Sequence, residues 1–89
     1  MSNHSTPEWG PIGRFHGMPQ DGSISAHLPN GASVGIFAPT APGLNAEAVL
    51  FFGTDRAPVV LVTDQPTVSR ARDIVESHWS DLRVMARER

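Results

Sequence analysis

The chain has 89 residues, a formal net charge of −2 and no cysteine. This length fits one small domain, and the lack of cysteine excludes a disulfide framework, a thiolate zinc site and a cysteine nucleophile. No apolar run approaches the roughly 20 residues that cross a bilayer, and residues 1–10 lack the basic and apolar regions of a signal peptide. We therefore expect a cytoplasmic protein without a membrane anchor. All basic residues are arginine, a bias typical of GC-rich bacterial or phage genes.

Residues 1–13 are rich in serine, proline and glycine and predict an irregular N-terminal arm ahead of a single domain at 14–89. Residues 12–18 are compatible with a short strand. Trp9 stands out within the arm, because a ring of this size is seldom left in water. We expect Trp9 to pack the arm onto the domain.

A β-hairpin is predicted at 23–28 and 32–38, where apolar and small polar residues alternate on both sides of a turn. A two-residue loop, Asn30-Gly31, would set Leu28 against Ser33. A three-residue loop at 29–31, with Gly31 in the left-handed conformation, gives one consistent apolar face. The predicted pairs are then Leu28 with Ala32, Ala26 with Val34 and Ile24 with Ile36.

Two further strands, at about 48–52 and 58–63, are apolar without alternation. Continuous apolar runs of this length indicate strands that are covered on both faces. A chain this short cannot supply two covering layers. We expect the C-terminal helix on one face and the arm or a second protein on the other.

The C-terminal segment at about 66–87 predicts one long helix, with Asp64 or Gln65 as its cap and Pro66 in its first turn. Its apolar residues fall within one arc of roughly 140°. A helix of about 22 residues is roughly 33 Å long, whereas the strands span about 17–20 Å, so its last turns should overhang the sheet. An alternative is a break near Ser80 and Asp81, followed by a strand at 82–86.

The overhanging turns would carry apolar side chains without a partner in the same chain, and a second copy is the simplest way to cover them. This interpretation predicts a homodimer or a complex with another protein. The expected interface residues are Phe51, Phe52, His78, Trp79, Leu82 and Met85.

A second interpretation is a small dimeric transcriptional or nucleic-acid-binding regulator that uses Arg83, Arg87 and Arg89 at the end of the helix. The helical segment carries five basic and four acidic residues, and residues 1–65 carry two basic and five acidic ones. This balance lacks the basic footprint of a nucleic-acid-binding domain, so a protein partner is favoured over nucleic acid.

The sequence contains no nucleophile elbow, phosphate-binding loop or dinucleotide fingerprint. His16 and His27 would form a metal pair only in a shifted strand register, and no acidic residue is placed beside them by spacing. We therefore predict no enzyme activity, no cofactor and no metal site.

The predicted fold class is α+β: an antiparallel β-meander of three to four strands with one long C-terminal α-helix packed on a sheet face. The predicted function is that of a non-enzymatic protein–protein interaction module, homodimeric, which acts by occupying a partner protein's surface.

Overall fold

The structure is a computed structural model that describes residues 7–12, 22–53 and 56–88. The elements are the strands β1 (Gly10–Pro11), β2 (Ile24–His27), β3 (Ser33–Phe37), β4 (Ala46–Phe51) and β5 (Val59–Gln65), the 3-10 turn η1 (Pro29–Gly31), and the helices α1 (Val68–Ser77) and α2 (Trp79–Arg87). The α+β class is confirmed. The sheet has five strands where three to four were expected, because the arm contributes β1.

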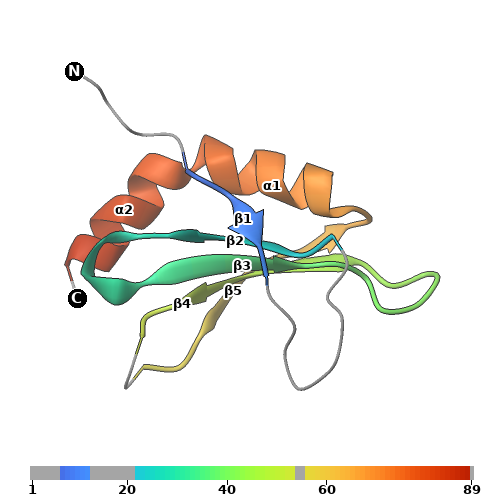
Figure 1. Cartoon of the computed structure of the whole chain (residues 1–89), viewed down its shortest axis with the longest axis horizontal. Helices are drawn as coiled ribbons and strands as arrows, with labels where there is room; N and C mark the ends of the chain where they lie inside the picture. The colour runs from blue at the N-terminus through green and yellow to red at the C-terminus, as the bar shows by residue number, and fades with distance from the viewer. Residues whose placement is uncertain (1–6, 13–21, 54–55, 89) are drawn as a thin grey trace.

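The strands form one antiparallel sheet in the order β1-β2-β3-β4-β5, so each strand pairs with its neighbour in the chain. Both helices lie on the same side of this sheet (Figure 1). The opposite side carries no helix among the residues that the structure describes. We call the two sides the covered face and the open face.

The β2–β3 hairpin has the predicted register, with Ala26 opposite Val34 and Ile24 opposite Ile36. Its three-residue loop is confirmed as η1, and Gly31 has the expected positive φ of 78°. Asn30 also has a positive φ, 63°, a conformation that asparagine tolerates better than most residues.

The covered face is lined by alanines and aliphatic side chains. Val34, Ile36 and Leu50 on the central strands are fully buried, and together with the buried face of the helices they form the single core cluster. Alanine occupies the remaining positions, which lets a helix lie close to the strands. These alanines are Ala26, Ala46 and Ala48 on the sheet and Ala71 and Ala86 on the helices.

The prediction of one continuous helix is wrong. The chain leaves helical geometry at His78, where φ is −113° and ψ is 15°, and helix resumes at Trp79, so the alternative of a strand at 82–86 is wrong as well. The expected cap is also wrong, because β5 continues to Gln65. Thr67 caps α1 instead, and its Oγ1 accepts a hydrogen bond of 3.2 Å from the Arg70 backbone N–H.

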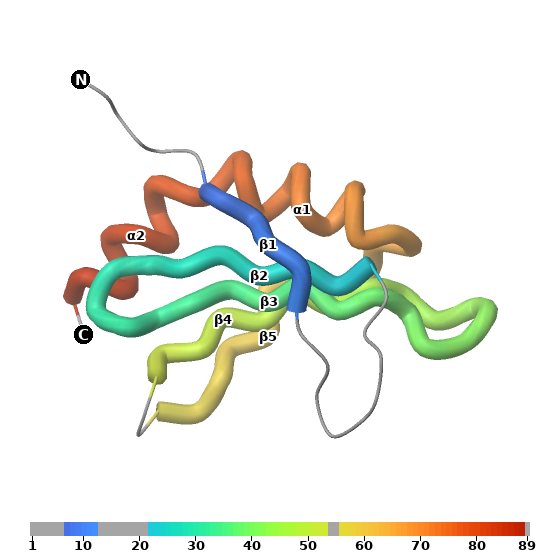
Figure 2. Tube along the Cα trace, in the orientation of Figure 1, coloured from blue at the N-terminus to red at the C-terminus, as the bar shows by residue number. Residues whose placement is uncertain are grey.

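The kink removes the predicted overhang. Beyond His78 the chain turns toward the β2–β3 hairpin, and Figure 2 shows the hairpin turn beside the end of α2. The Asn30 side-chain amide donates hydrogen bonds to the carbonyl oxygens of Ala86, at 3.0 Å, and Arg87, at 3.2 Å. These oxygens belong to the last turn of α2 and lack partners within the helix. The hairpin turn therefore caps the helix.

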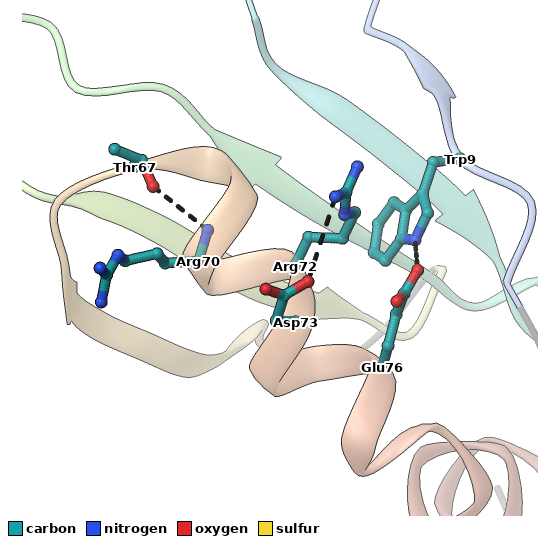
Figure 3. A network of polar contacts seen from close by, with 6 residues as sticks. All are labelled: Trp9, Thr67, Arg70, Arg72, Asp73 and Glu76. Carbon is teal, nitrogen blue, oxygen red and sulfur yellow. Dashed lines mark hydrogen bonds and ion pairs between the residues drawn. The ribbon is translucent and has the colours of Figure 1, made fainter.

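The arm is fastened to the helices by Trp9, as the sequence predicts. Its ring packs against Trp79 with the centroids 5.8 Å apart, and its Nε1 donates a hydrogen bond of 2.8 Å to Glu76 Oε2 (Figure 3). The residues between β1 and β2 that were expected to form a strand at 12–18 lie, except for Ile12, outside the described part of the chain.

Neither α1 nor α2 is long and apolar enough to cross a membrane, and the same holds for every helix among the described residues.

Candidate protein-interaction site

An aromatic pair occupies the centre of the open face. Side chains alternate along a strand, so Gly35 and Phe37 of β3 point away from the buried Val34 and Ile36. The rings of Phe37 and Phe51 meet edge to face over Gly35, with centroids 6.3 Å apart. A Cβ atom at Gly35 would lie only 3.1 Å from the Phe37 ring and 3.4 Å from the Phe51 ring. Glycine is therefore what lets the two rings close over the strand.

The apolar surface of the open face continues from this pair toward β5. Val49 is the register partner of Gly35 and, on its other side, of Val60. Val60 is 57% exposed, so the apolar row ends in water at the last strand. In the other direction Phe37 lines a hollow of about 370 Å³ with the exposed Leu44 on its rim.

The two edges of the sheet differ in their protection. β1 has two residues, and one of them is Pro11, which has no N–H to offer. A very short edge strand that contains proline is a common way to prevent further strand pairing. β5 has seven residues, contains no proline and carries one charged residue, Asp64, near its end.

The first half of β5 is apolar and exposed. Val59 is 40% and Val60 57% exposed, and the residues before them from Arg56 to Pro58 are exposed as well. β5 pairs only with β4 among the described residues, since it is the last strand in the sheet order. An edge strand leaves every second pair of backbone N–H and C=O groups without a partner in the sheet. We call the outward side of Val59–Gln65 the β5 edge.

The pairing of β4 with β5 is irregular at Leu61. Val49 is opposite Val60 and Ala48 is opposite Val62, so Leu61 is an extra residue on β5. A bulge of this kind bends the strand and raises its local twist. As a result Val60 lies on the open face, whereas Val62 is buried on the covered face.

A second hollow, of about 450 Å³, lies between the arm, the β2–β3 hairpin and α2. Its wall includes Trp79, His27, Glu8 and Arg83. Trp79 is only 3% exposed, because Trp9 packs over it. The hollow therefore offers a ligand the edge of a buried ring rather than an open aromatic surface.

The structure disperses the six residues that the sequence indicated for an interface. Trp79 and Leu82 are 3% and 5% exposed and belong to the core of their own chain, so the overhang argument for these two residues is wrong. His78 is exposed at the kink, and Met85 is 41% exposed on α2. Phe51 is half-buried on the open face, and Phe52 is half-buried with the Arg56 guanidinium 5.2 Å from its ring centroid.

The β5 edge was not among the residues predicted to form an interface. The run at 58–63 predicts a strand covered on both faces, yet Val59 and Val60 are exposed. One signal in the sequence indicates the edge position. When consecutive strands form a meander, the last strand before the helix lies at an edge of the sheet.

The three arginines of the nucleic-acid interpretation lie on or after α2. Arg83 is half-buried and lines the second hollow, and Arg87 is exposed at the end of the helix. Arg89 and His16 lie outside the described residues, so the proposed pairing of His16 with His27 is not addressed. Within residues 7–12, 22–53 and 56–88, no group of three or more histidine and acidic side chains is arranged to hold a metal ion.

No known protein family, curated protein or solved structure matches the chain. The site is therefore argued from its own residues alone.

Proposed function

We propose that the chain is a non-enzymatic protein–protein interaction module that binds an extended segment of protein along the β5 edge. The observation that carries this proposal is a seven-residue edge strand whose first residues, Val59 and Val60, are apolar and exposed. The opposite edge of the same sheet is short and contains Pro11.

Strand addition explains how such an edge binds protein. The unpaired backbone groups of the edge supply hydrogen bonds to any extended segment, and the side chains on both faces supply specificity. At the β5 edge an incoming strand would lie beside Val60 on the open face, next to the row that leads to Val49 and Phe51. Apolar side chains on the incoming strand would therefore extend an apolar surface that already exists.

The arrangement of charge favours protein over nucleic acid as the partner. A single-stranded nucleic acid needs aromatic rings and cations on the same surface. Here the exposed rings of Phe37 and Phe51 belong to the open face, whereas most described arginines lie on the helices across the sheet. These are Arg70, Arg72, Arg83 and Arg87.

The proposal is tested with a displayed library of short random peptides, selected on dilute immobilised chain. We expect enrichment of peptides with alternating β-branched residues, and loss of their binding in Val60→Lys, because a charge on an edge strand opposes pairing. Val84→Lys is the matched control, since Val84 is an exposed valine on α2.

Thermal melts of both variants establish that they fold. The proposal is overturned if no peptide is enriched, or if folded Val60→Lys binds the enriched peptides as well as Val84→Lys does.

A further inference from the structure

The β5 edge has a charge pattern that is complementary to itself. Arg56 precedes Val60 by as many residues as Asp64 follows it, and the positions closest to Val60 on both sides are uncharged. Both charged residues are exposed. A strand with this pattern presents a positive end and a negative end separated by an apolar centre.

We infer that the segment bound along the β5 edge is β5 of a second copy of this chain, paired antiparallel about a two-fold axis at Val60. This inference rests on the proposed function and names its partner. Antiparallel pairing about Val60 brings together residues equally distant from it, so Arg56 of each copy comes to the end where Asp64 of the other lies. A two-fold interface uses the same surface patch twice, and this strand satisfies that requirement.

Side-chain direction agrees with the same axis. Val60 lies on the open face, so the two copies of Val60 meet side by side there and cover the most exposed valine of the strand. With Leu61 left out as the bulged residue, Val59 of one copy faces Val62 of the other on the covered side. The helices of both copies then lie on one side of a continuous sheet and the two open faces on the other.

The bulge also limits the strength of the interface. It interrupts the regular ladder next to Val60, so the pairing consists of short stretches rather than seven consecutive residues. Small interfaces with few hydrogen bonds bind weakly, and we expect a dissociation constant on the order of micromolar.

Charge reversal tests both the partner and the register. Arg56→Asp places two aspartates at each end of the interface, and Asp64→Arg places two arginines there. Each variant alone is expected to dimerise about tenfold more weakly than the wild type. Mixing the two variants restores an opposite pair at both ends, so the mixture is expected to associate as tightly as the wild type. Sedimentation equilibrium across a concentration series measures all four samples.

Two controls separate the interface from the fold. Arg56 lies over the Phe52 ring, so thermal melts establish that Arg56→Asp is folded. Val60→Lys sets two like charges side by side at the axis and is expected to be monomeric wherever the wild type is dimeric, whereas Val84→Lys stays dimeric. Hydrogen exchange of the 58–62 amides is expected to slow as the wild-type concentration rises.

The inference is overturned if the wild type is monomeric throughout the series, or if it dimerises and the mixture of charge variants is no tighter than either variant alone. A monomer that still binds selected peptides at the β5 edge leaves the proposed function standing and removes the second copy. Failure of both experiments removes both.

Discussion

The two faces of the sheet are built from different residues and depend on different partners. The covered face combines alanines with Val34, Ile36 and Leu50, all at or near zero exposure beneath the helices. The open face places two phenylalanines over a glycine and leaves them half-buried. Small residues suit a surface that a helix must approach closely, whereas large rings cover a surface by packing on each other. The comparison teaches that residue size, as well as hydrophobicity, distinguishes the face that a helix covers.

The largest effect is expected where the covered face meets α2. Leu82→Asp buries a carboxylate without a partner in the core, and we expect a loss of about 3–5 kcal/mol in the free energy of unfolding. Met85→Asp, at a 41% exposed position on the same helix, is the control and should cost well under half as much. Urea denaturation of both variants measures the difference. Equal losses would mean that α2 does not pack on the sheet as described.

Leu50 and Phe51 are neighbours on β4 that point to opposite faces, so they compare the faces directly. Leu50→Ala removes a fully buried side chain and is expected to cost about 2–5 kcal/mol. Phe51→Ala removes a half-buried ring and its edge-to-face contact, worth about 1 kcal/mol. Denaturation midpoints in urea check the order, and a larger loss for Phe51→Ala would show that the open face is the main core.

Trp9 seals the side of the covered face where the arm crosses the helices. Trp9→Phe keeps an aromatic ring against Trp79 but loses the hydrogen bond to Glu76, and we expect a cost of about 1 kcal/mol by thermal denaturation. Glu76→Gln keeps an acceptor oxygen and should cost less. The role assigned to this hydrogen bond is wrong if both variants melt with the wild type.

The smallest effect is expected at Gly35. An added methyl group meets only the rings of Phe37 and Phe51, which border solvent and can shift. Gly35→Ala should therefore change the free energy of unfolding by less than about 0.5 kcal/mol while it moves the aromatic proton resonances of both rings. A loss of several kcal/mol would indicate that the open face is as tightly packed as the covered one.

Periodicity predicted the elements whose side chains alternate with burial. The register of β2 with β3 follows from the apolar positions 24, 26, 34 and 36, because one residue of slip would turn them toward solvent. The positive φ of Gly31 follows from the same argument.

The kink at His78 could not be predicted in this way. Neither proline nor glycine marks it, and the buried residues Val75, Trp79 and Leu82 on its two sides keep helical spacing through it. The cause of the kink lies far away in the chain, at the contact of Asn30 with the last turn of α2. Length alone predicted an overhang because it assumed a straight helix.

The candidate site was missed for a related reason. An apolar run such as 58–63 has the same composition whether its strand is central or at an edge, and only the sheet order assigns β5 to the edge. Phe51, by contrast, was predicted as an interface residue from its strand, and the structure places it on the open face beside that edge.

The contact between Trp9 and Trp79 also decides what optical spectroscopy reports. The chain has two tryptophans and no tyrosine, and both indoles lie in this one contact. Intrinsic fluorescence therefore comes from a single point, the junction of the arm with the helices. An emission change on heating would record the release of the arm, while far-ultraviolet circular dichroism would record the helices and the sheet. If the arm detaches first, the two curves separate.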